Sequence, residues 1–176
     1  MNFSLDKEQA AIQNAVREFL AKEAKNLARE AEEIEEGYSR ELWQKMADLG
    51  WMGVSFPEEY GGSEGDFLDL VLILEEMGKV LVPGPFIPSV ICSGHVILKY
   101  GSEVQRREFL PKLTNGSLVV IPALIKPVAY GTEGSIKEQV DVKDGDYILS
   151  GMRLFVPYAH LAGWFIYRAM SDKGNT

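Results

Sequence analysis

The sequence predicts an α+β fold, in which an all-helical N-terminal domain is followed by a β-rich domain. Through about residue 115, apolar side chains recur at the spacing of amphipathic helices, and capping residues precede them. From Ser117 to Ile125 the pattern changes to an apolar, β-branched run that is typical of a buried strand. We therefore expect two domains, residues 1–115 and 116–176, with the sheet of the second one incomplete.

The first helix is expected to begin at Asp6, because Asp6 and Gln9 have the spacing of a capping box. It should end at Gly37. Its apolar stripe is predicted to consist of Ile12, Val16, Phe19, Leu20, Leu27 and Ile34. A second helix should be capped by Ser39 and ended by Gly50. Its buried face is predicted to be Leu42, Met46 and Leu49, with Trp43 at the edge.

The stretch from Leu49 to Gly62 connects two helices and contains four glycines, one proline and three aromatic residues. Gly50 suits the left-handed conformation that closes a helix, and Gly61 followed by Gly62 predicts a sharp turn. We interpret the stretch as an irregular connection that is held in the core by Trp51, Met52, Val54 and Phe56.

A third helix is predicted from Asp66, and it is apolar almost all round, which indicates a central, buried helix. Glu75 and Glu76 are the exceptions, and we expect them at a partly exposed edge in salt bridges. Prolines and a glycine break the chain at residues 83–85, and a fourth helix should run over residues 88–101.

A capping box at Ser102 and Gln105 predicts a fifth, short helix, which Pro111 should kink or end. His95 in the fourth helix has no His, Cys or acid at ligand spacing, so we expect a structural histidine. Cys92 lies in an apolar run and is expected to be a small core residue.

The second domain should contain several short strands. The turn signal Asp144-Gly145-Asp146 predicts a hairpin. The predicted strands cover residues 117–125, 136–142, 147–149, 153–156 and 163–169.

Composition excludes several classes of function. The net charge of −8 argues against nucleic acid and against an anionic membrane surface as partners. A single cysteine cannot form an internal disulfide, which favours a reducing, cytoplasmic location. No apolar run is long enough to predict a membrane span, and the first residues do not resemble a signal peptide. The sequence contains no phosphate-binding glycine loop, no nucleophile elbow and no paired cysteines, so neither a catalytic residue nor a metal site is assigned.

Five segments, in the same order, resemble the first half of an acyl-CoA dehydrogenase. They are the loop over residues 51–62, LEEMGK at 74–79, FLPKLTNG at 109–116, the strand ending in Ala123-Leu124, and DGDYILSG at 144–151. The resemblance implies a helical domain followed by a β-barrel domain, FAD as cofactor, and α,β-dehydrogenation of an acyl-CoA thioester. It places the catalytic glutamate in a C-terminal helical bundle beyond these residues, so the chain's own status as an enzyme stays open.

The resemblance also implies which residues face the flavin or the thioester. Ile125 stands where the family has the threonine of Thr-Glu-Pro, and Phe155–Pro157 stands where it has Trp-Ile-Thr. The complete implied set is Leu124, Ile125, Gly131, Thr132, Phe155, Val156 and Pro157.

Two further functions stay open. Ile125 and Pro157 lack the family's hydroxyls, which favours a non-catalytic, degenerate subunit that associates with an active acyl-CoA dehydrogenase chain. An unrelated helical interaction module is the other alternative. Under the family hypotheses we expect a homo-oligomer or a companion subunit, because the helical and β-rich faces would otherwise expose apolar surface.

Overall fold

The computed structural model describes residues 4–124, 139–143 and 146–168. Its helices are α1 (Lys7–Glu23), α2 (Leu27–Glu32), α3 (Arg40–Asp48), α4 (Phe67–Lys79), α5 (Gly94–Tyr100) and α6 (Glu103–Thr114). Short turns of 3-10 helix are η1 (Trp51–Gly53), η2 (Glu58–Tyr60) and η4 (Ala159–Leu161), and η3 (Phe86–Ser93) is a π-helix. The strands are β1 (Val120–Ala123), β2 (Gln139–Lys143), β3 (Asp146–Ser150) and β4 (Trp164–Tyr167). The α+β prediction is thereby confirmed.

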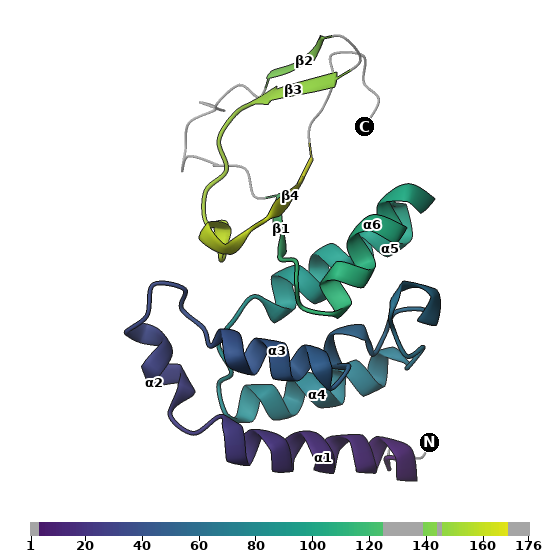
Figure 1. Ribbon diagram of the computed structural model, residues 1–176, viewed down its shortest axis with the longest axis vertical. Helices are drawn as coiled ribbons and strands as arrows, with labels where there is room; N and C mark the ends of the chain where they lie inside the picture. Colours follow the sequence, from purple (N-terminus) through teal and green to yellow (C-terminus); the bar gives the residue numbers. More distant parts are fainter. Residues whose placement is uncertain (1–3, 125–138, 144–145, 169–176) are drawn as a thin grey trace.

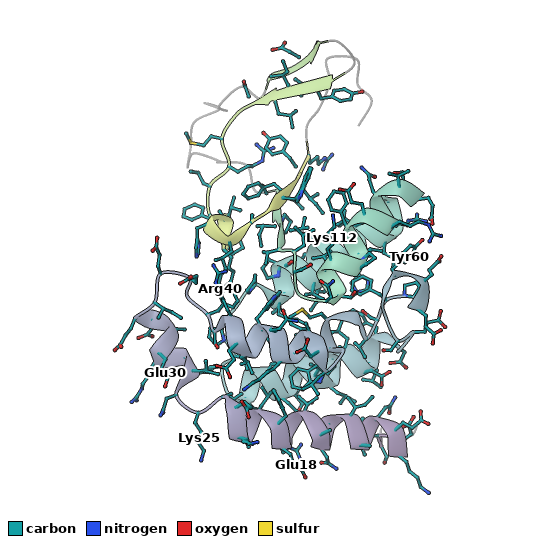
Figure 2. All side chains as sticks on the ribbon, in the orientation of Figure 1. Glu18, Lys25, Glu30, Arg40, Tyr60 and Lys112 are labelled. Atoms are coloured by element: carbon teal, nitrogen blue, oxygen red, sulfur yellow. The ribbon has the colours of Figure 1, made fainter. Side chains whose placement is uncertain are left out.

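The helices and the strands occupy opposite ends of the molecule. In Figure 1, α1, α4 and α3 lie one above another at the N-terminal end, and the β2–β3 pair lies at the far end. β1 and β4 lie between these two ends, next to α5 and α6. Charged side chains such as Glu18 on α1, Lys25 in the turn after it and Glu30 on α2 project outward (Figure 2). Within the described ranges, no helix has both the length and the apolarity to cross a bilayer.

The predicted helix starts at Asp6 and Ser102 are confirmed. The Asp6 carboxylate accepts from the Gln9 amide at 2.9 Å, and the Gln9 side chain accepts from the Asp6 amide at 3.1 Å. Ser102 and Gln105 form the same reciprocal pair before α6. Pro111 does not end α6, which continues to Thr114, although proline has no N–H to donate to the carbonyl four residues earlier.

The single helix predicted from Asp6 to Gly37 is wrong. Asn26 adopts a left-handed conformation with φ of 64°, and it separates α1 from the shorter α2. Asparagine tolerates this conformation better than most residues, so the chain changes direction there. Ile34, which was expected on the apolar stripe, is exposed in the turn after α2 as a result.

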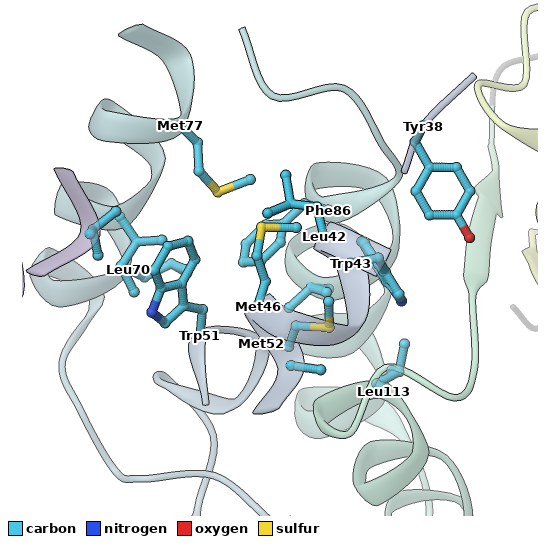
Figure 3. Packing of buried hydrophobic residues seen from close by; sticks show 14 of the residues in the cluster. Tyr38, Leu42, Trp43, Met46, Trp51, Met52, Leu70, Met77, Phe86 and Leu113 are labelled. Atoms are coloured by element: carbon cyan, nitrogen blue, oxygen red, sulfur yellow. The ribbon is translucent and has the colours of Figure 1, made fainter. Parts of the chain in front are cut away.

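Helix α3 begins at the predicted cap, since Ser39 Oγ accepts from the Leu42 amide at 3.1 Å. Trp43 was expected at an edge but is only 4% exposed, and its indole Nε1 donates to the Gly116 carbonyl at 2.9 Å. Figure 3 shows this indole in the core, where its ring meets Tyr38 and Phe86 edge-on, with ring centroids 5.9 and 6.4 Å away.

The burial predicted for Leu49 is also wrong, since its side chain is 51% exposed. Leu49 is the residue that follows the last turn of α3, so it has already left the buried face.

The connection after α3 has the predicted character. Gly50 has φ of 79° and Gly61 has φ of 83°, so both turns use the left-handed region that glycine enters without strain. Trp51, Met52 and Phe56 are buried between the helices, as expected, and Val54 packs against them with part of its side chain exposed.

Helix α4 is less central than its composition predicts. Phe67, Leu68 and Val71 are exposed on one side of it, while the opposite side packs on α1. Glu76, expected at a partly exposed edge, is instead 3% exposed in that α1–α4 contact. The carboxylate of Glu76 accepts from Arg17 Nη2 and from Lys79 Nζ, both at 2.8 Å. The predicted salt bridge is therefore present, but it is buried on the carboxylate side.

We expect Glu76→Gln to lower the free energy of unfolding at pH 7 by about 1 to 2 kcal/mol, since the half-exposed Arg17 screens the pair. Hydrogen bonding from Arg17 holds the pKa of Glu76 below its ordinary value, against the effect of burial. The carboxylate's contribution is therefore fully present above its unfolded-state pKa and is lost as the pH falls through the lower folded-state pKa.

Urea denaturation of Glu76→Gln at pH 7 and at pH 3 measures this effect, and the difference from the native chain should shrink at the lower pH. Glu75→Gln is the matched control, because Glu75 is half exposed and pairs with Lys79 at the surface. Equal losses in the two variants would contradict the buried role of Glu76.

The fourth predicted helix is divided in two. The π-helix η3 begins at Phe86, two residues before Pro88, and continues into α5. Cys92 was expected in the core but is exposed, because the wider π-turn directs it away from Ser89 and Val90, which are buried against β1. The Ser89 hydroxyl accepts from the Val120 amide at 3.1 Å and so ties η3 to β1.

The strands form two separate pairs. β1 and β4 are parallel, with Val120 opposite Trp164. β2 and β3 are antiparallel, as a hairpin around residues 144–145 requires, although the turn itself lies outside the described residues. The strand predicted at 153–156 is absent, since those residues pair with no neighbour in the described part. The division at residues 115 and 116 stays a prediction.

Candidate functional site

The carboxyl ends of β1 and β4 are joined by one arginine. Arg153 Nε donates to the Ala123 carbonyl at 3.0 Å, and Arg153 Nη2 donates to the Arg168 carbonyl at 2.9 Å. The same guanidinium lies over the Tyr167 ring, 3.9 Å from its centroid. Arg153 therefore fixes the backbone immediately before the exposed Leu124, and with it one edge of the candidate site.

The segment after Arg153 presents an aromatic ring to solvent. Phe155 is 86% exposed, and its φ of 53° is unusual for a residue with a side chain. Tyr158, three residues on, has the same φ of 53°. Such conformations cost energy and persist where the surroundings impose them, often at functional positions.

Two side chains attach this segment to the helical region. The Tyr158 hydroxyl accepts from the Gly84 amide at 3.1 Å. His160 Nε2 lies 3.2 Å from the Glu36 carbonyl, which can only accept, so that nitrogen is assigned as the donor. The segment is thus held at Arg153, at Tyr158 and at His160.

An apolar groove of about 450 Å³ adjoins the segment at Tyr158. The end of α4, the turn after it and the start of η3 form its walls. Its lining residues are Leu74, Met77, Gly78, Leu81, Val82, Gly84, Phe86, Ile87, Pro88 and Tyr158. A groove of this composition suits an alkyl chain, because burying each methylene stabilises the bound state by about 0.8 kcal/mol.

A second groove of about 400 Å³ lies between α5, α6 and β4. Val96, Tyr100, Phe109 and Trp164 are among its lining residues. Phe109 and Trp164 meet edge-on there, with ring centroids 5.2 Å apart. It is not lined by Leu124 or by the segment 153–158.

The structure describes only some of the predicted site residues. Leu124 and residues 155–157 are described. Arg153 connects them, because it donates a hydrogen bond to the Ala123 carbonyl and lies two positions before Phe155. Ile125, Gly131 and Thr132 fall outside the described residues. Sequence reasoning did not identify Arg153 or Tyr158. For Arg153 a signal exists, since it is a single cation between Met152 and Leu154.

Both histidines and several carboxylates of the described part have structural partners. His95 lies 3.2 Å from Ser55 Oγ and stacks on Phe56, and its burial lowers its pKa. Hydrogen bonding from Lys45 lowers the pKa of Glu23, and Glu76 is paired as described above. The described residues include no cluster of three or more metal-binding side chains. None of these groups is therefore assigned as a general base.

Comparison with known proteins decides the family. A family model described as "Acyl-CoA dehydrogenase, N-terminal domain" matches residues 6–117. The chain belongs to the acyl-CoA dehydrogenase family. The short-chain specific acyl-CoA dehydrogenase of Clostridium acetobutylicum is 34% identical over 180 residues, which cover 98% of this chain and 46% of the relative. The chain thus spans less than half the length of that relative.

Solved structures agree with the family fold. The ChsE4-ChsE5 complex from Mycobacterium tuberculosis matches with a TM-score of 0.84 and 26% identity, over 99% of this chain and 47% of that one. An acyl-CoA dehydrogenase complexed with FAD, from Bacillus anthracis, matches with a TM-score of 0.81 and 26% identity, over 95% of this chain and 30% of that one. The family fold expected from the sequence motifs is thereby confirmed.

Proposed function

We propose that this chain forms part of an FAD-dependent acyl-CoA dehydrogenase, an oxidoreductase that removes hydrogens from the α and β carbons of an acyl-CoA thioester. One observation carries the proposal: the apolar groove and the segment that presents Phe155 meet at Tyr158. The name of the Clostridium relative and the FAD complex of the Bacillus structure support it.

The residues present fit a flavin mainly through stacking. Phe155 offers an exposed aromatic face, and aromatic stacking contributes about 0.5 to 1.5 kcal/mol. Pro157 has no backbone N–H, and neither Phe155 nor Val156 carries a polar side chain. We propose Leu124, Ile125, Gly131, Thr132 and residues 155–157 as the flavin-facing set. FAD, when bound, supplies the two-electron acceptor.

The groove supplies the second half of the proposed site. Its side chains from α4 and η3 would bury the alkyl part of the substrate and exclude water from it. The carboxyl end of β1, held by Arg153, would place the backbone near Leu124 beside the thioester. The base that removes the α proton is not among the residues assigned in this chain.

Titration of the chain with FAD, followed by flavin fluorescence, tests the proposal directly. We expect saturable binding that Phe155→Ala weakens about fivefold through loss of the stacked ring. Phe67→Ala is the matched control, because Phe67 is also exposed but lies on α4. If the native chain does not bind FAD, or if both variants bind equally, this chain does not provide the flavin surface.

The same proposal includes association with another chain, a cytoplasmic location and acyl-CoA as the substrate. Large apolar side chains are exposed at Leu124, Met152, Phe155, Trp164 and Phe165, which favours a partner surface. The Mycobacterium structure is a complex of two named subunits, which supports a homo-oligomer or a companion subunit here. The name of the Clostridium relative favours the dehydrogenase over a degenerate, non-catalytic subunit.

A further inference from the structure

Tyr158 stands where the two halves of the candidate site meet. It follows the flavin-facing Phe155–Pro157 directly in the chain, and its side chain lines the apolar groove. We propose that Tyr158 is a positioning residue: its hydroxyl holds the Phe155–Pro157 segment in a fixed place beside the groove by accepting the Gly84 amide. The role in substrate binding rests on the function proposed above, whereas the hydrogen bond does not.

The backbone at Tyr158 shows that the segment is held rather than relaxed. Tyr158 has φ of 53° and ψ of 30°, a left-handed conformation that disfavours residues with a Cβ. Phe155 has a φ of 53° as well. Two such residues within four positions require external contacts to maintain them. The bond between Tyr158 and Gly84 is such a contact, and it joins residues 74 positions apart.

Gly84 is well suited to receive this contact. Its neighbours Pro83 and Pro85 have no backbone N–H, so the Gly84 amide is the one donor of that turn. The φ of 137° at Gly84 excludes most other residues. Phe86, two residues after Gly84, begins η3, which lines the groove. A contact at Gly84 therefore fixes the start of a groove wall.

A second attachment lies close to the first, and both reach backbone near the core residue Tyr38. His160 contacts the Glu36 carbonyl, and its ring lies 6.5 Å from that of Tyr158. Glu36 is two residues before Tyr38, and a Cβ added at Gly84 would lie 3.5 Å from the Tyr38 side chain. Tyr38 is buried beside Trp43 (Figure 3), so both attachments reach a firmly packed part of the helical region.

The consequence for the site is a fixed spacing between its two surfaces. With the hydroxyl in place, the groove wall at Phe86 and the backbone that carries Phe155 are kept in one relative position. Without it, the segment keeps its attachments at Arg153 and His160 but loses the one nearest the groove. Tyr158→Phe removes only this hydroxyl and retains the ring that lines the groove.

The hydrogen bond can be observed through a single NMR signal. Pro83-Gly84 is the one Pro-Gly step in the sequence, so labelling with ¹³C-carbonyl proline and ¹⁵N-glycine selects the Gly84 amide. We expect Tyr158→Phe to speed hydrogen exchange of this amide about fivefold, as loss of one hydrogen bond predicts. Tyr100→Phe is the matched control, because Tyr100 is exposed on α5 and belongs to the other groove. Unchanged exchange in Tyr158→Phe would overturn the proposal.

The positioning role is tested with an unreactive alkyl-thioether of CoA, with CoA itself for comparison. Tyr158→Phe should weaken binding of the alkyl-thioether about fivefold and leave binding of CoA unchanged. Faster Gly84 exchange with native affinity for the alkyl-thioether would overturn the positioning role.

A native chain that binds no alkyl-thioether would count against the proposed function instead. The hydrogen bond between Tyr158 and Gly84 would then be tested by hydrogen exchange of the amides in residues 152–161. Tyr158→Phe should accelerate this exchange, and Tyr100→Phe should not. Equal rates in both variants would overturn it.

Discussion

Replacement of Gly62 by alanine is expected to lower the free energy of unfolding by at least about 3 kcal/mol, at the upper end of overpacking effects. A Cβ at this position would lie 1.9 Å from the Phe56 carbonyl oxygen and 2.6 Å from the Gly53 carbonyl oxygen. Both obstacles are backbone atoms, so no side-chain rotation relieves the contact. The connection between α3 and α4 would have to change its path.

The two carbonyls near Gly62 also carry the hydrogen bonds of the connection. The Gly53 carbonyl accepts from the Ser63 amide at 3.1 Å, and the Phe56 carbonyl accepts from the Glu64 amide at 3.0 Å. Moving either carbonyl away from a new Cβ would break these bonds and withdraw the buried Phe56 from the core. Steric and hydrogen-bond losses therefore add at one position.

Urea denaturation followed by far-UV circular dichroism measures the effect of Gly62→Ala. Gly78→Ala is the matched control, because a Cβ at Gly78 on α4 meets nothing within 4 Å. The control should gain up to about 1 kcal/mol from the higher helix propensity of alanine. A Gly62→Ala chain as stable as the native one would show that the connection is not rigidly packed.

Local signals in the sequence were sufficient for three helix boundaries, at Asp6, Gly50 and Ser102. The capping boxes at Asp6 and Ser102 and the stop at Gly50 involve residues at most a few positions apart, so their chemistry is visible in the sequence. The break between α1 and α2 at Asn26 was not predicted, because a left-handed asparagine leaves a far weaker signal in the sequence than a glycine.

Burial depended on contacts between distant segments and was predicted less well. Glu76 is buried because Arg17, 59 positions away, supplies its hydrogen bonds. Cys92 is exposed because η3 winds as a π-helix, which the spacing of apolar residues does not reveal.

In the candidate site, too, residues within motifs could be predicted from the sequence, whereas contacts between distant residues could not. The motif resemblance indicated Phe155 and Leu124 as candidate site residues, and this stays a prediction from alignment alone. Arg153 and Tyr158 act on partners 30 and 74 positions away, at Ala123 and Gly84. Arg153 stands out in the sequence as a single cation between Met152 and Leu154, but no local pattern indicates the partner of either residue.

Trp43→Ala is the second change for which we expect a large effect, a loss of about 3 to 5 kcal/mol. The indole fills the centre of the helical core between Tyr38 and Phe86, and its removal leaves a large cavity. Its Nε1 also donates to the Gly116 carbonyl, which lies just before β1. Alanine would leave that carbonyl without its indole donor as well as emptying the core.

Two further variants separate the contributions of volume and hydrogen bond at Trp43. Trp43→Phe keeps a ring against Tyr38 and Phe86 but removes the donor to Gly116, so it should cost clearly less than Trp43→Ala. Trp164→Ala is the matched control for removing an indole, because Trp164 on β4 is 54% exposed. Urea midpoints by far-UV circular dichroism give the order: Trp43→Ala lowest, Trp43→Phe intermediate and Trp164→Ala nearest to native. Similar midpoints for Trp43→Ala and Trp164→Ala would show that α3 and the start of β1 are joined by other contacts than this indole.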